Sequence, residues 1–310
     1  MGRSTTIHSS GTTPATSPFV VHDERFASVL GDAPRLFRVV ETDAHEGPAY
    51  VAEEDALYFT TVRRERVSIK RLALPDRSVS VVREDANTAN GMALAPDGRL
   101  VVCEQGTLTT PARITLVDRA TGGTEPIVEA FDGLPLSSPN DVVVARDGSI
   151  WFTDPSYGHL QGFRPEPSLP DQVYRHDPRT GKTTVAAVGF DKPNGLAFSP
   201  DGRVLYVGDN GAPHHLLAFD LSDDQSGAGR RIAVGTPEHP DGLEVDAEGR
   251  IYASASTGLH VLAPSGDLIG EIRLPGAVNF TFGGPDRNIL FITKDDAIWA
   301  AALDTKGARP

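Results

Sequence analysis

The chain has few of the residues that disulfide-rich, zinc-binding or membrane-spanning proteins need. A single cysteine, Cys103, excludes an internal disulfide and any multi-cysteine zinc site. No stretch is long and apolar enough to span a membrane. No apolar segment with a basic flank opens the sequence, so neither an anchor nor a signal peptide is expected. These absences predict a cytoplasmic protein.

Positive charge is also scarce. The 29 Lys and Arg residues face 42 Asp and Glu residues, which leaves a formal net charge of -13 at pH 7. Nucleic acid and anionic membrane surfaces would repel such a chain, so both are disfavoured as partners. We expect a small-molecule ligand instead, and the sequence does not determine the oligomeric state.

Glycine and proline are plentiful, with 31 and 24 residues, and β-branched residues crowd the short apolar runs. Few windows show the spacing of apolar residues that marks an amphipathic helix. This composition favours an all-β protein rich in turns.

One phrase recurs along the chain. In its clearest copy, residues 192–207, the polar residue Asn194 and a glycine precede a short apolar strand, a Pro-Asp-Gly turn and a second apolar strand. Such a turn between two β-rich runs is typical of a hairpin. Further copies, some of them looser, begin near Glu46, Ala89, Pro139, Pro240 and Asn279.

The spacing of the six copies predicts the architecture. The residues that follow the polar position are 47, 91, 141, 195, 242 and 280, so successive copies begin 38 to 54 residues apart. A repeat of roughly 40 to 50 residues with several short strands is typical of a β-propeller blade. We therefore predict a single domain over residues 18–310, a six-bladed β-propeller with four-stranded blades. A solenoid is the alternative architecture. Residues 1–17 are rich in Ser, Thr, Gly and Pro, and we expect a disordered tail there.

The last unit ends near Leu303 after only two or three clear strands. An open edge strand invites aggregation, so we expect an N-terminal strand to complete the blade and close the ring. The run Phe19–Leu30 is interpreted as one or two strands, and the closing strand is placed near Phe26–Leu30 or Leu36–Val40. The longest insertions are either substrate lids or inert loops. They comprise His159–Asp171, Asn210–Leu216 and Ser222–Arg230.

A ring of polar side chains follows from the propeller geometry. The first strand of each blade lines the central channel, so the residue just before it should lie at the channel mouth. All six of these residues carry a side-chain oxygen, and they are Glu46, Asn90, Asn140, Asn194, Asp241 and Asn279. Any one of them could serve only as a turn residue. Six together indicate a site, because Ser, Gly and Thr would serve turns equally well.

Converging oxygens with two carboxylates suit a hard divalent cation. Ca²⁺ in particular tolerates irregular oxygen ligation. Zn²⁺ would prefer His or Cys ligands, and the ring has none. We predict one divalent cation, with Ca²⁺ favoured and Zn²⁺, Mg²⁺ or Mn²⁺ as alternatives.

The motifs resemble those of the SMP-30/gluconolactonase/LRE-like family. The likeness covers Glu46 to Leu303 and rests on Glu46-Gly-Pro, Ser138-Pro-Asn-Asp141, residues 151–158 and 192–201, and Pro240-Asp-Gly242. It implies a six-bladed propeller with one cation at the channel mouth. The implied metal ligands are Glu46, Asn140, Asn194 and Asp241. Asn90 and Asn279 are then expected to contact the substrate.

Further polar residues end the second strands of blades two to four. Glu104, Asp154 and Tyr157 are predicted to contribute to the substrate pocket, whereas Asp209 is interpreted as a turn cap. A pocket role for His45 is a lesser alternative.

The leading hypothesis is a metal-dependent hydrolase of a lactone or related ester, which is also what the family resemblance implies. Asp241, or alternatively Asp141, would accept the proton of the attacking water. Two alternatives stay open. The same metal site could serve phosphotriester hydrolysis, or the isomerisation or cyclisation of a metabolite. The protein could also be a binding propeller with Ca²⁺ as a structural plug.

Overall fold

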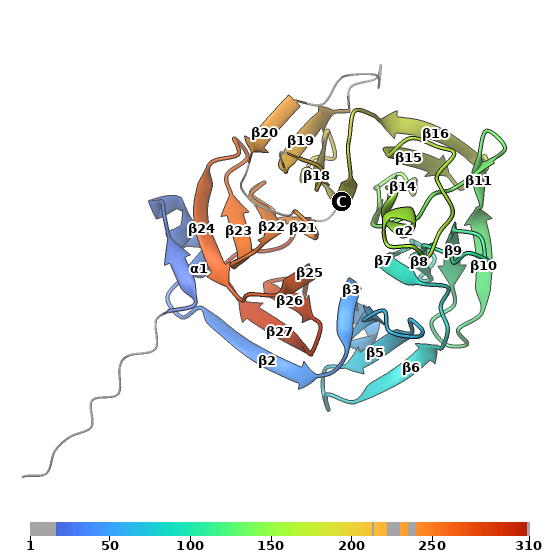
Figure 1. The fold of residues 1–310 in the computed structure, drawn as a ribbon. Coiled ribbons are helices and arrows are strands. Elements are labelled where there is room, and N and C mark those ends of the chain that lie inside the picture. Colours follow the sequence, from blue (N-terminus) through green and yellow to red (C-terminus); the bar gives the residue numbers. More distant parts are fainter. Residues whose placement is uncertain (1–16, 213, 222–229, 235–239, 309–310) are drawn as a thin grey trace, which may run out of the picture.

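The computed structural model describes residues 17–212, 214–221, 230–234 and 240–308. Within these residues, six antiparallel sheets surround a central axis, as the blades of a propeller do (Figure 1). The first strand of each blade lies nearest the axis (Figure 1). This arrangement confirms the predicted six-bladed, all-β architecture. The predicted tail lies outside the described residues, apart from Ser17.

Blades one to four each consist of four strands that follow one another in the chain. Blade one contains β3 (Ala44–Val51), β4 (Ala56–Thr61), β5 (Ile69–Ala73) and β6 (Val79–Arg83). Blade two contains β7 (Ala89–Leu94), β8 (Leu100–Glu104), β9 (Arg113–Val117) and β10 (Thr124–Val128). Blade three contains β13 (Val142–Val144), β14 (Ile150–Asp154), β15 (Gln172–Asp177) and β16 (Lys182–Ala187). Blade four contains β17 (Pro193–Phe198), β18 (Val204–Asp209), β19 (His215–Asp220) and β20 (Arg230–Val234).

The last two blades each recruit a strand from the N-terminal part of the chain. Blade five contains β21 (Leu243–Val245), β22 (Ile251–Ala255), β23 (Gly258–Leu262), β24 (Leu268–Arg273) and β1 (Phe19–Val21). Blade six contains β25 (Ala277–Gly283), β26 (Ile289–Lys294), β27 (Ala297–Ala302) and β2 (Arg35–Glu41). Because β2 pairs with β27, the second of the two predicted closing strands is confirmed. Blade five has five strands and not the expected four, since β1 pairs with its outer edge.

The other predicted closing segment, Phe26–Leu30, is helical, so its interpretation as a strand was wrong. Asp23 caps η1 (Glu24–Phe26) by accepting the Arg25 N–H at 2.9 Å, and α1 (Ala27–Leu30) follows directly. Phe26 and Val29 are both fully buried. Their spacing of three residues matches one face of a helix, not of a strand.

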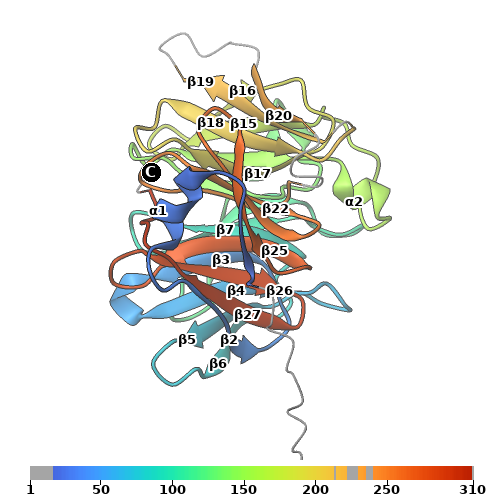
Figure 2. The same cartoon turned by 90° about the vertical axis from the view of Figure 1, so that its left-hand side faces the viewer.

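Few other short elements interrupt the blades. They are η2 (Ala52–Glu54), the hairpin of β11 (Ala130–Phe131) and β12 (Leu134–Pro135), and α2 (Tyr157–Leu160). Figure 2 shows α2 standing out from one face of the ring. No helix of the described residues is long and apolar enough to cross a membrane. Cytoplasmic residence stays a prediction.

Apolar side chains between adjacent blades form the core. Between blades four and five, for example, Leu216 and Ala218 pack with Val245 and Ile251. Burying one such Leu, Ile or Val side chain stabilises the fold by about 1.5–3 kcal/mol. The blades are thereby held at fixed angles, and the inner ends of their first strands face one another across the channel.

Candidate metal and substrate site

The predicted ring residues lie where the first strands are locally irregular. The strand register shifts at Asn90, Asn194 and Asn279, and it also shifts around Glu46. A β-bulge opposes two residues to one on the neighbouring strand and redirects a side chain. The local irregularity therefore lets a polar side chain depart from the regular alternation of the strand at each of these four positions.

Glycine follows four of the six ring residues because the blades approach one another closely there. The Gly91 N–H donates to the Asn140 carbonyl at 2.8 Å, and the Gly195 N–H donates to the Asp241 carbonyl at 2.9 Å. A Cβ atom on Gly195 would lie only 2.0 Å from that carbonyl oxygen. No other residue fits without moving backbone. These hydrogen bonds join the mouth residues of adjacent blades directly.

Hydroxyl groups on the second strands hold the ring residues from the other side. The Asp241 N–H donates to Ser254 Oγ at 2.9 Å, and the Asn279 N–H donates to Thr293 Oγ1 at 3.1 Å. The backbone at these positions is therefore fixed by both neighbours before any ligand binds, which is the condition for a preorganised site.

The ring encloses a cavity of about 390 Å³ at the channel mouth. Six of the predicted site residues line it, namely Glu46, Asn90, Asn140, Tyr157, Asn194 and Asp241. Asp141 and Asn279 instead line a second cavity, of about 250 Å³, that the first strands enclose. Glu104 and Asp154 line neither of these two cavities.

Two carboxyl groups meet in the mouth cavity. Glu46 is 3 % exposed, and its carboxyl group shares a hydrogen bond with that of Asp241. Burial raises the pKa of Glu46 well above its usual range, and the negative charges of Asp241 and Asp141 raise it further. Desolvation likewise raises the pKa of Asp241, although His45 and hydrogen bonds with Glu46 and Asn194 oppose it. No described Lys or Arg forms an ion pair with either carboxylate.

The donor set fits a hard cation better than it fits a structural ion pair. Asn279 Nδ2 donates to Glu46 Oε2 at 2.7 Å, which orients that carboxylate but brings no charge. Asn90 Oδ1 is buried without a hydrogen-bond partner. The described residues contain no group of three or more His, Cys, Asp and Glu side chains arranged for a metal. A cation at this position would therefore need amide oxygens among its ligands, which would suit Ca²⁺ better than Zn²⁺.

Comparison with known proteins gives a family. The model of the SMP-30/gluconolactonase/LRE-like region matches residues 44–295. The chain belongs to this family. A gluconolactonase of Zymomonas mobilis is 29 % identical over 252 residues, which cover 73 % of this chain and 68 % of that protein. A lactonohydrolase of Aspergillus oryzae is 25 % identical and covers 88 % of this chain and 71 % of that protein.

Solved structures agree with this result. A gluconolactonase from Xanthomonas campestris is 34 % identical, with a TM-score of 0.83. The match covers 96 % of this chain and 99 % of that one. This SMP-30/gluconolactonase family member therefore shares its fold with that gluconolactonase over nearly the whole of both chains.

In this member of the SMP-30/gluconolactonase family, the strand-end carboxylates serve the loops around the cavity. Asp154 accepts the backbone N–H groups of Ser137 and Ser138 at 2.9 and 2.8 Å. Burial raises the pKa of Asp154 to about 7, against the effect of these two donors. Asp209 accepts the N–H groups of Asp191 and Lys192 at 3.0 and 2.7 Å, so the interpretation as a cap is confirmed for Asp209.

Glu104 is neutralised away from the mouth. Its carboxylate accepts hydrogen bonds from Arg83 Nη1 at 2.5 Å, Arg113 Nε at 2.7 Å and Asn87 Nδ2 at 2.9 Å. With two arginines on a fully buried carboxylate, the side chain ties strands of blades one and two together. The structure thus places Glu104, like Asp154, among the supports of the site.

Tyr157 does reach the cavity. Asn194 Nδ2 donates to its hydroxyl oxygen at 3.4 Å, and a second hydrogen bond joins that hydroxyl to Asn210. Burial raises the pKa of the Tyr157 hydroxyl, so the group stays protonated and can donate a hydrogen bond to a ligand. Asn210 Oδ1 is buried without a partner.

Two residues that line the cavity were not marked by the sequence motifs. Arg63 and Gln161 line the cavity, and both lie in loops that follow a second strand. Their place after a second strand could have indicated them, because the second strand of a blade ends at the face of the propeller where the first strand begins. Of the predicted insertions, residues 222–229 lie outside the described residues. The loop after α2 is held in place by Arg164, which donates to the carbonyls of Thr107, Thr110, Leu136 and Ser137.

Proposed function

We propose that the protein is a divalent-metal-dependent hydrolase of a small lactone. The observation that carries this proposal is the meeting of Glu46 and Asp241 in one cavity, with no Lys or Arg of the described residues in an ion pair with either. The names of the relatives, gluconolactonase and lactonohydrolase, support the class of substrate. A cavity of about 390 Å³ is in the range of small-molecule sites.

Four residues would hold the cation: Glu46, Asn140, Asn194 and Asp241. All four line the same cavity, and the carbonyls of Asn140 and Asp241 accept backbone hydrogen bonds from the neighbouring blades. When bound, a divalent cation supplies Lewis-acid polarisation of a carbonyl oxygen and increases the acidity of water. The carboxylates would then be ionised, since a neighbouring positive charge favours their charged form.

Asp241 is the better placed of the two candidate bases. It lines the mouth cavity, whereas the carboxylate of Asp141 lines the inner one and accepts the Val142 N–H at 2.9 Å. A general base must reach the proton that it abstracts, at about 2.6–3.2 Å between heavy atoms. We assign the proton transfer to Asp241 and keep Asp141 as the candidate that replaces it if Asp241 is only a ligand.

Neutral polar groups would orient the substrate. Asn90 and Asn210 each present a buried acceptor oxygen without a partner, and the Tyr157 hydroxyl lies between Asn194 and Asn210. These groups can pair with substrate hydroxyls, which both donate and accept hydrogen bonds. Asn279 and Asp154 would act indirectly, Asn279 on the Glu46 carboxylate and Asp154 on the loop that precedes Asn140.

The test is a hydrolysis assay over a panel of γ- and δ-lactones, with and without chelator. We expect chelator-sensitive turnover that returns with Ca²⁺ or another divalent ion. Asp241→Asn, saturated with metal, should lose about 10²- to 10⁴-fold in turnover, the usual cost of a general base. Asp209→Asn is the matched control, because it changes an enclosed Asp that contacts only the protein, and its turnover should be retained.

Three results would redirect the proposal. Full activity of the saturated Asp241→Asn variant would transfer the role of base to Asp141. Metal binding without turnover of any lactone, ester or phosphotriester would favour the binding propeller with a structural ion. Turnover of phosphotriesters alone would keep the metal site and change the reaction.

A further inference from the structure

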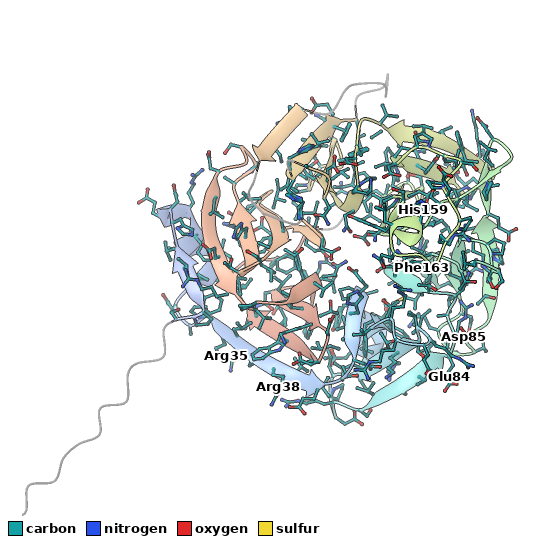
Figure 3. All side chains as sticks on the ribbon, in the orientation of Figure 1. Arg35, Arg38, Glu84, Asp85, His159 and Phe163 are labelled. Atoms are coloured by element: carbon teal, nitrogen blue, oxygen red, sulfur yellow. The ribbon has the colours of Figure 1, made fainter. Side chains whose placement is uncertain are left out.

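Arg63 is exposed and brings a positive charge to the rim of the mouth cavity. It follows β4 in blade one, yet its guanidinium carbon lies 4.1 Å from the ring centroid of Phe163, which follows α2 in blade three. Its Nη2 also donates to Gln161 Oε1 at 3.2 Å. Figure 3 labels Phe163 and also His159 of α2. The side chain therefore bridges two blades at the rim.

No other Lys or Arg lines this cavity among the described residues. Neighbouring arginines of the first two blades are neutralised by carboxylates: Arg71 by Glu54, and Arg83 and Arg113 by Glu104. No ion pair joins Arg63 to a carboxylate of the described residues. An unneutralised guanidinium is notable in a chain with a formal net charge of -13.

The contacts of Arg63 leave most of its donors available. A guanidinium has five N–H donors in a planar fork, and the hydrogen bond to Gln161 uses one of them. Stacking on Phe163 occupies the face of the group and leaves its edge open. A planar edge with parallel donors matches a carboxylate, which accepts two hydrogen bonds at once. The stacking also restricts the side chain before a ligand arrives, which lowers the entropic cost of binding.

We propose that Arg63 recognises a carboxylate on the substrate, so that the preferred substrate is an acidic lactone, a sugar-acid lactone with a second carboxyl group. This inference rests on the proposed lactone hydrolysis. The carbonyl end of the substrate would lie toward Glu46 and Asp241, its hydroxyl groups toward Asn90 and Asn210, and its carboxylate toward Arg63. The specificity would thus come from a loop of blade one and not from the metal ligands.

The test compares two lactones that differ in one group. D-glucaro-1,4-lactone carries a carboxylate at C6, and D-glucono-1,4-lactone carries a hydroxymethyl group there. With metal-saturated protein, kcat/KM should be higher for the acidic lactone. Arg63→Gln should lower the value for the acidic lactone by about 10- to 100-fold, the worth of a hydrogen-bonded charge, while the neutral lactone changes by less than about threefold. Arg63→Lys should give an intermediate loss, because it keeps the charge and loses the fork.

Arg64→Gln and Arg66→Gln are the matched controls. Both residues are exposed in the same loop and neither lines the cavity. These variants remove the same charge, so they report any general effect of net charge on an anionic substrate. An equal loss for both lactones in Arg63→Gln would overturn the inference and make Arg63 a structural bridge between blades. An acidic-lactone loss in Arg64→Gln as large as in Arg63→Gln would overturn it too.

Failure of the proposed function is separable from failure of this inference. If the wild type hydrolyses neither lactone, calorimetric titration of the metal-loaded protein with D-glucarate and D-gluconate replaces the assay. The two ligands share one carboxylate and differ in the second. Arg63→Gln should weaken D-glucarate alone by about 10- to 100-fold. Equal affinities of wild type and variant for D-glucarate would overturn the role of Arg63.

Discussion

Two sets of enclosed carboxylates lie within this propeller, and they differ in what surrounds them. Asp154 and Asp209 each accept two backbone N–H groups of the loop that precedes their own blade. Glu46 and Asp241 instead face each other, and the charge of Asp241 raises the pKa of Glu46. Burial is common to both sets. Glu46 also accepts two hydrogen bonds, from the Gly47 N–H and from Asn279 Nδ2, so the number of donors does not separate the two sets. The contact with a second carboxyl group does, and we propose that this pair is the one that binds a cation.

Glu46→Gln should have the largest effect on this contrast. Loss of an outer-shell partner typically costs about 10- to 100-fold in metal affinity, so we expect loss of a ligand carboxylate to cost at least about 100-fold. The metal-free variant should melt higher than the metal-free wild type, because Glu46 must take up a proton on folding, or meet the charge of Asp241, and the neutral amide avoids both costs. Calorimetric titration with Ca²⁺ and thermal melts with and without chelator measure both effects.

Asp209→Asn should behave in the opposite way. The amide replaces an acceptor oxygen by an N–H donor that faces a backbone N–H donor. The free energy of unfolding should therefore fall by about 1–3 kcal/mol, while the metal affinity stays unchanged. If both variants melt lower without metal, the contrast between the two sets of carboxylates does not hold.

Asn279→Ala should have the next largest effect. It removes the donor that orients Glu46 Oε2 at 2.7 Å without removing a ligand. We expect metal affinity to fall by about 10- to 100-fold, less than for Glu46→Gln. The variant also loses the Asn279 Oδ1 acceptor of the Phe280 N–H, so its melting curve is measured in parallel. Unchanged affinity in a folded variant would mean that Glu46 needs no orientation to bind metal.

Asp97→Asn extends the comparison to an exposed carboxylate and should have the smallest effect. The Arg99 side chain and its backbone N–H lower the pKa of Asp97, whose side chain is 50 % exposed. A lowered folded-state pKa adds stability above the unfolded value of about 3.9, and this contribution disappears as the pH falls through the folded value. At pH 7 the variant should lose about 0.5 kcal/mol or less, because solvent screens the pair. Urea titrations from pH 7 to pH 2 measure the difference, and a loss that grows toward acid would contradict the assignment.

Local signals carried most of the prediction of the fold. Each blade repeats a polar residue and a hairpin, with a glycine after the polar residue in four of the six, and the structure has a blade at each repeat. The segment Phe26–Leu30 was misinterpreted because a short apolar run suits either a strand or a helix until its partners are known. Its partner is Gly270, where a Cβ atom would lie 2.1 Å from the Phe26 ring, a contact across more than two hundred residues.

The residues at the ends of the second strands show what local sequence patterns could not predict. A position at the end of a second strand placed Glu104 and Asp154 at the correct face of the ring, but it does not determine which way a side chain points. Arg83 and Arg113 draw Glu104 away from the channel, and the N–H groups of Ser137 and Ser138 draw Asp154 into its own loop. No sequence motif identifies these hydrogen-bond and ion-pair partners, because they come together only in the folded chain.

By itself, then, the sequence determined the number of blades and the polar residue that opens each, because a polar residue followed by a hairpin is a local pattern that recurs with the repeat. Only the tertiary structure decided which side chains share the cavity. Arg63 meets Gln161 and Phe163 across the mouth, and Glu46 meets Asp241, because ring closure brings distant blades to within hydrogen-bond distance. Closure depends on the packing between all six blades and on the N-terminal strand β2, so no single stretch of the chain contains that information.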